Sequence, residues 1–328
     1  MLIREIGEFN LIERMSKALS SSGRNVIVGI GDDTAVLPFN GDKLQLVTTD
    51  MLIQDVHFRT TTATPEQIGW KSLAANISDI AAMGGEPTYA FISIGLPKTT
   101  TVEFVDKFYS GMNEIAKLYS VDIAGGDTVS SPQVIINIAL LGEVNKDNLI
   151  LRSGAEVGDA VMVTGDLGGS MAGLEILEHK LTFHDTEKHL KPIPRVNEGV
   201  LLARSGWVTS MIDVSDGLAS EINHICKMSK TGASIQMKSI PLSQNVRQVS
   251  DIIGKNPYDF ALFGGEDYEL VFTCKPDKVQ ELKDMMDNEG NAEVTELGCI
   301  EDADKSVKIK DISGKIMQLS SKGYDHFV

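Results

Sequence analysis

Short apolar runs alternate with helical hydrophobic periodicities along most of the chain. Apolar runs rich in β-branched residues predict buried strands, and apolar positions that recur every three to four residues predict helices. Residues 179–196 are predicted to be irregular. Strands are predicted at 26–30, 43–49, 88–96, 121–124, 134–144, 160–164, 233–237, 269–274 and 293–299. Helices are predicted at 7–20, 64–84, 102–119 and 277–288, through 171–177, and through 218–225.

The helix that follows Thr64 has the clearest start. Pro65 suits the first helical position, and Gln67 is placed to complete a capping box with Thr64. Farther along this helix, Asn76 and Asp79 lie three residues apart. They are therefore expected on one face of the helix.

The alternation of strands and helices in both halves of the 328-residue chain predicts two α/β or α+β domains. Polarity rises over 144–158, which is typical of a domain boundary. We therefore predict an N-terminal domain at 1–146 and a C-terminal domain at 147–328. The segment Gly125-Gly126-Asp127 is predicted to be a turn between two strands.

Composition narrows the function. The net charge is −16 and Lys and Arg are scattered, which argues against a nucleic-acid or anionic-membrane partner. No 18-residue apolar run predicts a transmembrane helix. The three cysteines are far apart and lack metal-ligand spacing, which indicates a reducing compartment. Since the first residues also lack the pattern of a signal peptide, we expect a cytoplasmic protein.

Acidic residues recur beside Gly, Ser or Thr, mostly where apolar runs end. One such motif is an ordinary turn, but its repetition predicts that distant segments build one acidic pocket. Crowded carboxylates that are shielded from water repel each other, so they either take up protons or hold divalent cations. The motifs lie at 29–33, 44–50, 76–79, 123–127, 163–166, 212–216 and 263–267.

Phosphate binding is the usual reason to gather several divalent cations in one pocket. The chain has no Gly-x-x-x-x-Gly-Lys-Ser/Thr loop, and Gly29-Ile-Gly31 lacks a third glycine. A bound nucleotide is therefore expected to be held through Mg²⁺ that bridges its phosphates to aspartates. Oxygen ligands select Mg²⁺ over Zn²⁺, and Thr48 and Thr49 offer hydroxyls beside Asp50.

Seven motifs in order along essentially the whole chain carry a resemblance. They are Gly-Ile-Gly-Asp-Asp (29–33), Thr-Thr-Asp-Met-Leu with His-Phe (48–58), Asn-Ile-Ser-Asp-Ile-Ala-Ala-Met-Gly (76–84), Gly-Gly-Asp-Thr (125–128), Asp-Val-Ser-Asp-Gly-Leu (213–218), Gly-Gly-Glu-Asp-Tyr-Glu-Leu (264–270) and Gly-Tyr-Asp-His-Phe (323–327). Together they resemble the thiamine-monophosphate kinase family of the aminoimidazole ribonucleotide synthetase-like superfamily. Asp55 stands where this family more often has glycine.

The resemblance implies a reaction in which ATP and thiamine monophosphate give ADP and thiamine diphosphate, with several Mg²⁺ ions. It also implies a homodimer whose N-terminal domains share a β-barrel, and a nucleotide cleft against the C-terminal α/β domain. The implied metal ligands are Asp33, Thr48, Thr49, Asp50, Asp79, Asp127, Asp213 and Asp216, of which Asp33, Asp50, Asp79 and Asp127 are catalytic. The implied ATP contacts are Gly126, Asp127, Arg152 and Ser215, and the implied substrate contacts are His57, Glu266 and Tyr324.

The chemistry is consistent with these roles. The acceptor is a phosphate monoester that is already ionised near neutral pH, so the transfer needs no strong general base. We therefore expect direct in-line transfer without a phospho-enzyme. Arg152 suits a bidentate phosphate contact, and Tyr324 suits stacking on a cationic ring. From the residues alone, His57, Glu266, Tyr324 and Arg152 are also compatible with structural roles.

The sequence is also compatible with other functions. One is that of another ATP-dependent synthetase of the same superfamily, although a selenophosphate synthetase uses a reactive residue near its N-terminus and the first cysteine here is Cys226. A purine-pathway synthetase lacks the Gly-Tyr-Asp-His-Phe ending found here. A hydrogenase-maturation protein uses a C-terminal cysteine, whereas this sequence ends in His-Phe-Val. A non-catalytic module that binds Mg²⁺ and nucleotide is the third alternative.

Overall fold

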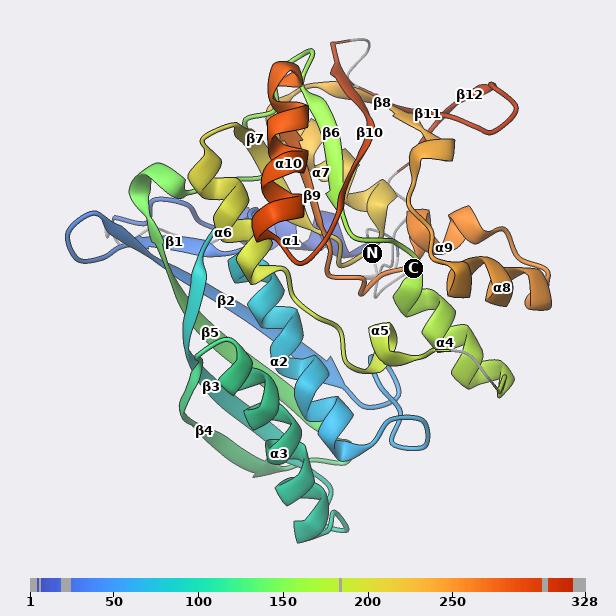
Figure 1. Cartoon of the computed structure of the whole chain (residues 1–328). Coiled ribbons are helices and arrows are strands. Elements are labelled where there is room, and N and C mark those ends of the chain that lie inside the picture. Colours follow the sequence, from blue (N-terminus) through green and yellow to red (C-terminus); the bar gives the residue numbers. More distant parts are fainter. Residues whose placement is uncertain (1–4, 6, 19–24, 183–184, 303–305, 321–328) are drawn as a thin grey trace.

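The structure, a computed structural model, describes residues 5, 7–18, 25–182, 185–302 and 306–320. Two sheets, one in each half of the chain, are packed with helices (Figure 1). This arrangement confirms the predicted mixed class of helices and sheets. The first half contains α1 (Gly7–Ala18), β1 (Ala35–Pro38), β2 (Lys43–Ile53), α2 (Pro65–Ala82), β3 (Glu86–Leu96), α3 (Val102–Leu118), β4 (Asp122–Ser130), β5 (Ile135–Asn145) and the 3₁₀ turn η2 (Lys146–Asn148).

The first sheet has five strands in the order β1-β2-β5-β3-β4. Its neighbours are antiparallel except for the parallel pair β3 and β4. Helix α2 packs on the inner face, where Ile92 and Ile138 are buried with Ile77 and Ile80. Helix α3 packs beside α2 (Figure 1). The opposite face, called the outer face below, carries Met51, Tyr89, Phe91 and Val129, which are 43–55% exposed.

Helix α2 begins as its sequence predicts. The Thr64 hydroxyl accepts from the Gln67 amide, and the Gln67 side chain accepts from the Thr64 amide, which completes the capping box. Two glycines let α2 and α3 approach closely. A Cβ at Gly69 would lie 2.0 Å from the Phe108 carbonyl oxygen, and one at Gly111 would lie 1.9 Å from the Glu66 carbonyl oxygen.

The second sheet has seven strands in the order β12-β11-β8-β10-β6-β9-β7. One apolar cluster joins its strands to α7, and another joins them to α6 and α10. The second half contains β6 (Ala160–Thr164), α4 (Gly169–His179), α5 (Glu187–Leu190), α6 (Val196–Ser205), β7 (Val208–Asp213), α7 (Leu218–Ser229), β8 (Gly232–Gln236), η3 (Met237–Ser239), α8 (Gln244–Ile253), α9 (Pro257–Phe263), β9 (Leu270–Cys274), η4 (Pro276–Lys278), α10 (Val279–Glu289), β10 (Val294–Glu301), β11 (Val307–Lys310) and β12 (Ile316–Gln318).

Helix α2 also connects the two halves. Its last residue, Ala82, is buried in the apolar cluster that contains Leu202 and Phe272. Near its start, the Trp70 indole N–H donates to the Pro192 carbonyl oxygen at 2.7 Å. The chain passes from β5 to β6 over 146–159, so the predicted division between 146 and 147 lies in the connection and stays a prediction.

Three predicted elements are wrong. Residues 26–30 form isolated bridges at Val28 and Ile30 rather than a strand. The predicted turn at 125–127 lies inside β4, which pairs in parallel with β3. Gly126 has a φ of 157°, and a Cβ there would lie 1.8 Å from the Ile92 carbonyl oxygen of β3, so the close pairing requires glycine. The segment 179–196, predicted to be irregular, contains the helical turn α5.

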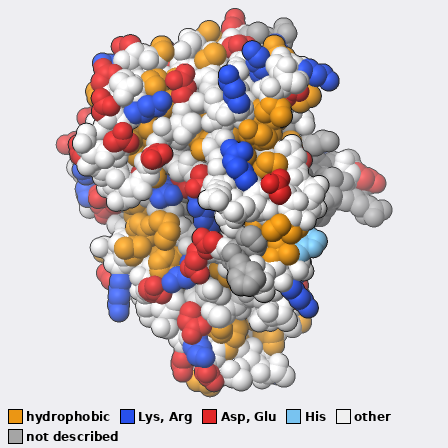
Figure 2. Space-filling model, turned by 45° about the vertical axis from the view of Figure 1, so that its right-hand side comes forward, with side chains coloured by type: hydrophobic (Ala, Val, Ile, Leu, Met, Phe, Trp, Pro, Cys, Tyr) orange, Lys and Arg blue, Asp and Glu red, His pale blue; other side chains and the backbone are white. Residues whose placement is uncertain are grey.

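On the face shown in Figure 2, acidic and basic side chains are interspersed, with hydrophobic groups between them. None of the described helices is both long enough and apolar enough to cross a membrane.

Candidate active site

Three carboxylates from distant segments meet at the junction of the two halves. Asp33 follows the bridged segment at 28–32, Asp79 lies on α2 and Asp213 ends β7. One ligand oxygen from each lies within 4.8 Å of the other two. Asp50 of β2 is electrostatically coupled to Asp79 and Asp213. These four residues are called the acidic centre below.

The acidic centre is short of positive charge. Burial, followed by repulsion from Asp50, raises the pKa of Asp79 well above its ordinary value. Burial, followed by repulsion from Asp33, raises the pKa of Asp213 to about 8, and burial raises the pKa of Asp50 to about 6. Carboxylates in this state gain most from a bound cation, because it compensates both the lost hydration and the repulsion.

Neighbouring hydroxyls fix the orientation of two of these carboxylates. The Thr48 hydroxyl donates to Asp79 Oδ2, and the Ser78 hydroxyl donates to Asp213 Oδ2 at 2.6 Å. The Asn76 side-chain oxygen accepts from the Asp50 amide at 3.2 Å. The predicted face of α2 that carries Asn76 and Asp79 therefore does face the pocket.

Arg152 is the cation bound to the acidic centre. Its Nε and Nη2 both donate to Asp33 Oδ1, at 3.1 and 2.5 Å. Its backbone amide donates to Asp32 at 3.2 Å, and burial raises the pKa of Asp32 to about 6. Burial raises the pKa of Asp33, and Arg152 opposes that rise. Asp33 Oδ2 is buried and has no hydrogen-bond partner in the described part of the chain, so it is available to a metal.

Asp216 and Ser215 lie next to the acidic centre in the connection from β7 to α7. The Asp216 amide donates to Glu221 Oε1 at 3.1 Å. Burial, then repulsion from Asp216, raises the pKa of Glu221 well above its ordinary value. The Ser215 carbonyl oxygen accepts from the Glu266 amide at 2.7 Å, which ties this connection to the segment before β9.

Thr49, Gly126 and Asp127 lie apart from the acidic centre. Thr48 and Asp50 point inward on β2, so Thr49 points to the outer face, where its hydroxyl accepts from Asn137 at 3.0 Å. Asp127 is exposed on the edge strand β4. Three strand spacings, about 14 Å, separate β4 from β2. The prediction that Asp127 and the Thr49 hydroxyl share this pocket is therefore not met within one chain.

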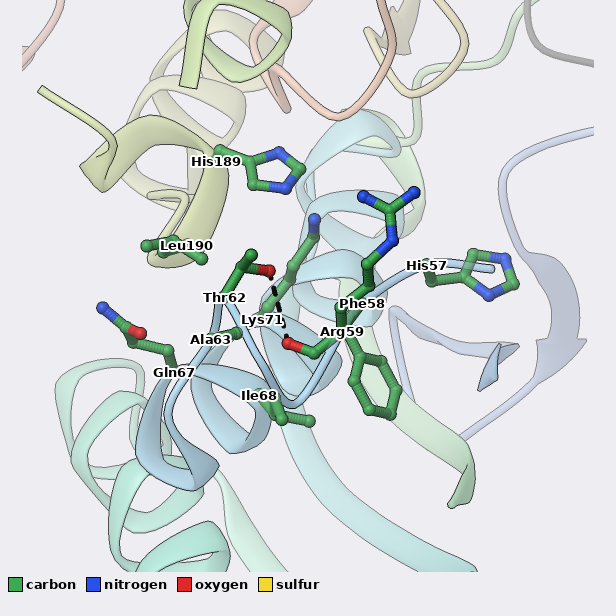
Figure 3. Close-up of a pocket in the computed structure, with 10 residues that line it drawn as sticks. All are labelled: His57, Phe58, Arg59, Thr62, Ala63, Gln67, Ile68, Lys71, His189 and Leu190. Atoms are coloured by element: carbon green, nitrogen blue, oxygen red, sulfur yellow. Dashed lines mark hydrogen bonds between the residues drawn. The ribbon is translucent and has the colours of Figure 1, made fainter. Parts of the chain in front are cut away.

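A small recess lies at the N-terminal half of α2, between α2, α5 and the segment 57–63 (Figure 3). It is lined by His57, Arg59, Lys71 and His189, among others. His57 Nδ1 accepts from the Ile53 amide at 2.9 Å, which holds its ring at the end of β2. Tyr324, the third predicted substrate contact, lies outside the described residues.

The backbone before His57 is unusual. Asp55 has a φ of 66°, which is the left-handed region that favours glycine, and its amide donates to the Phe58 carbonyl oxygen at 2.7 Å. Glycine, which the resemblance leads us to expect at this position, would adopt this geometry without strain. The aspartate adopts it in a tight turn that precedes His57.

Glu266 faces the same region. Its Oε2 accepts from Lys71 Nζ at 2.7 Å and lies 3.6 Å from His189 Nδ1. Burial alone would raise the pKa of Glu266, but the Lys71 ammonium holds it below its ordinary value. Burial lowers the pKa of His189 to about 3, so its ring is neutral at pH 7 and Lys71 supplies the compensating charge. The sequence prediction missed Lys71; the available signal was a lysine among the apolar positions of α2.

Family models match both halves of the chain. The model described as AIR synthase related protein, N-terminal domain, matches residues 31–144. The model described as AIR synthase related protein, C-terminal domain, matches residues 156–310. The first match covers the first sheet except for the last residue of β5. The second match covers the second sheet except for β12.

Curated relatives match along the full length. Thiamine-monophosphate kinase of Aquifex aeolicus (strain VF5) is 34% identical, with 100% of both chains covered. Thiamine-monophosphate kinase of Bacillus subtilis (strain 168) is 36% identical, covering 98% of this chain and 99% of the relative. This chain belongs to the thiamine-monophosphate kinase family. The family assignment confirms the resemblance carried by the seven motifs.

Solved structures of this family share the fold. The structure described as AaThiL complexed with AMPPCP and TMP is 34% identical, has a TM-score of 0.87 and covers 99% of both chains. Hydrogenase maturation protein HypE in complex with ATP is 19% identical, has a TM-score of 0.73 and covers 90% of both chains. At that identity, HypE shows the common fold alone.

Proposed function

We propose that this chain transfers the γ-phosphoryl group of ATP to thiamine monophosphate, forming ADP and thiamine diphosphate. The full-length relatives are named thiamine-monophosphate kinases, and a solved relative is described as complexed with AMPPCP and TMP. The observation that carries the proposal is the buried acidic centre, with ligand oxygens of Asp33, Asp79 and Asp213 within 4.8 Å of one another.

The acidic centre fits Mg²⁺. Its donors are carboxylate and hydroxyl oxygens, which Mg²⁺ prefers, and Asp33 Oδ2 is a buried oxygen that has no hydrogen-bond partner among the described residues. Bound Mg²⁺ would neutralise the charges that keep two phosphate-bearing substrates apart. The residues that would hold several ions are Asp33, Thr48, Asp50, Asp79, Asp213 and Asp216.

The chain's own residues would bind and orient the reactants. Arg152, which is bound to Asp33 of the acidic centre, would contact the phosphates of ATP. Ser215, two residues after Asp213 in the connection from β7 to α7, would be a second ATP contact. The acceptor phosphate is ionised near pH 7, so no side chain has to remove a proton from it. Direct in-line transfer by positioned reactants follows from this chemistry.

The acceptor would bind on the side of the acidic centre that carries His57 and Glu266. His57 has its ring held at the end of β2, and Glu266 presents a carboxylate suited to a cationic or amino-bearing ring. Tyr324, implied by the resemblance, is proposed to complete this contact.

A homodimer would account for the outer face of the first sheet. Large exposed apolar side chains that share one face of a sheet are typical of an interaction surface. Met51, Phe91 and Val129 come from three strands of that face and are 51%, 43% and 55% exposed. A second copy would cover this face and form the β-barrel that the resemblance implies. Thr49, Gly126 and Asp127 would then act in the ATP and metal site only within the dimer.

The deciding experiment incubates the purified chain with ATP, Mg²⁺ and thiamine monophosphate. We expect stoichiometric ADP and thiamine diphosphate, and no product after Mg²⁺ is chelated. ADP formation without thiamine diphosphate would favour another synthetase of the superfamily. Nucleotide binding without turnover would favour a binding module. A covalent phosphate trapped on the protein would contradict direct transfer.

A further inference from the structure

Lys71 is a buried cation inside the N-terminal half of α2. It is 3% exposed, and its flanking residue Trp70 is buried as well. An ammonium group in such surroundings is unfavourable unless a carboxylate pairs with it. Among the residues that the structure describes, its ion-pair partner is Glu266, 195 positions away in sequence, with Nζ and Oε2 2.7 Å apart.

Glu266 is held in a strained and well-fixed conformation. Its φ of 65° is unfavourable for a non-glycine residue, and such residues gather at functional sites. Its amide donates to Ser215, and a Cβ at the preceding Gly265 would lie 2.4 Å from the Ser215 carbonyl oxygen. The backbone is therefore pressed against the connection that follows Asp213. With the backbone fixed, the orientation of the Glu266 carboxylate depends on its side-chain torsions and on its ion pair with Lys71.

The two oxygens of Glu266 have different surroundings. Oε2 is the oxygen that contacts Lys71 and lies near His189, whereas Oε1 takes part in neither of these two contacts. The Glu266 side chain is 28% exposed, while that of Lys71 is 4% exposed. Lys71 lines the small recess of Figure 3, and of the two paired side chains the Glu266 carboxylate is the more accessible one.

We propose that Lys71 is a positioning residue for the acceptor. It holds Glu266 through Oε2, so that Oε1 accepts from the amino-bearing, cationic heterocycle of thiamine monophosphate. This inference rests on the proposed function and adds a residue of α2 to it. Lys71 does not touch the substrate, and its effect is transmitted entirely by Glu266.

The test measures steady-state kinetics for Lys71→Met, Glu266→Gln and the double variant. Lys43→Met is the matched control, because Lys43 pairs with Glu143, which is 23% exposed and lies on the first sheet. We expect Lys71→Met to raise KM for thiamine monophosphate about tenfold, which corresponds to one lost charge-assisted contact. KM for ATP and kcat are expected to stay within about twofold. Lys43→Met is expected to change neither KM.

The double variant separates positioning from direct contact. It carries neither charge of the pair, so it also covers the case in which Lys71→Met alone folds poorly. If Lys71 acts through Glu266, the double variant has the same KM for thiamine monophosphate as Glu266→Gln. A further increase in the double variant would overturn the inference. So would a Lys71→Met variant that changes both KM values equally, or neither.

Turnover by the wild-type protein separates a failure of the role of Lys71 from a failure of the proposed function. If it makes thiamine diphosphate and the variants behave otherwise than expected, only the role of Lys71 is wrong. If it makes none, the proposed function fails, and the role of Lys71 in acceptor binding fails with it.

Discussion

Single residues of the acidic centre work against the stability of the metal-free fold. Asp33 is balanced by Arg152, but Asp50, Asp79 and Asp213 share no comparable cation among the described residues. Hydroxyls of Thr48 and Ser78 orient two of the carboxylates without neutralising them. The chain therefore retains a local repulsion that bound metal can relieve, which is a common feature of functional sites.

Replacing Asp50 by Asn is expected to remove most of the turnover while the fold is kept. The change deletes a metal-binding oxygen and one repelling charge, so kcat should fall by about 100-fold or more and thermal stability should not fall. Turnover assays and thermal unfolding measure the two parts. Asp106→Asn, at an exposed position of α3, is the control and should resemble wild type. Near-wild-type turnover of Asp50→Asn would exclude Asp50 as a metal ligand.

The raised pKa of Asp213 predicts a pH dependence of stability in the presence of a chelator. The folded-state pKa is about 8, whereas an unfolded Asp titrates near ~3.9. Because the folded pKa is the higher one, the wild-type protein loses stability as the pH rises between these values. Asp213→Asn lacks this loss. The melting temperature of the variant minus that of wild type should therefore increase from pH 5 to pH 8.

Added Mg²⁺ gives the internal control for this comparison. It should raise the melting temperature of wild type more than that of Asp213→Asn at pH 8, because the variant has lost a ligand. A difference between the two proteins that stays constant from pH 5 to pH 8 in chelator would contradict the titration of Asp213.

Helix α2 is the element on which the site depends most. It packs so closely against α3 that Gly69 and Gly111 leave no room for a larger side chain. Gly111→Ala would place a Cβ 1.9 Å from the Glu66 carbonyl oxygen, so the helices would have to move apart. We expect the free energy of unfolding to fall by about 2 kcal/mol or more, measured by urea denaturation. Gly29→Ala, whose Cβ would meet nothing closer than 3.9 Å, should change it by less than ~0.5 kcal/mol. Equal effects would show that the close approach is not limiting.

How far the sequence predicts an element depends on whether its signals are local. The start of α2 was predictable from Thr64, Pro65 and Gln67, which act within one turn of the helix. The motifs around Asp33, Asp79 and Asp213 were predictable because each acid stands beside residues typical of loops or metal sites.

Other features depend on contacts between distant segments. Glycines favour turns, so the segment at 125–127 was predicted as one, but parallel pairing with β3 makes it a strand. Likewise, the partner of Lys71 lies 195 positions away. Strands β11 and β12, four and three residues long, have no hydrophobic pattern long enough to identify them.

For the molecule as a whole, the outer face of the first sheet predicts assembly. Phe91→Glu would bury a charge if a second copy covers this face, so the protein should change from dimer to monomer in sedimentation velocity. Val102→Glu is the control, because Val102 is 77% exposed at the start of α3, away from the sheet face. A monomeric wild-type protein, or a dimeric Phe91→Glu variant, would contradict the homodimer.

The same assembly bears on the position of Asp127. If Asp127 acts only in the dimer, Phe91→Glu should also reduce turnover, even though Phe91 lies outside the acidic centre. The loss should be smaller at high protein concentration, where association partly recovers.

Helix α2 carries Lys71 and Asp79 on one rigid rod, eight residues and therefore roughly 12 Å apart. A tilt of α2 would therefore shift Asp79 at the proposed nucleotide site and Lys71 on the proposed acceptor side at the same time. Substitutions within α2 that change its orientation are therefore expected to affect both sites. An attempt to redesign which vitamin analogue is accepted should leave α2 intact and change the segment 57–63, which lines the recess on the proposed acceptor side. The segment 264–268 is less suitable, because its backbone is hydrogen-bonded to the connection that carries Ser215.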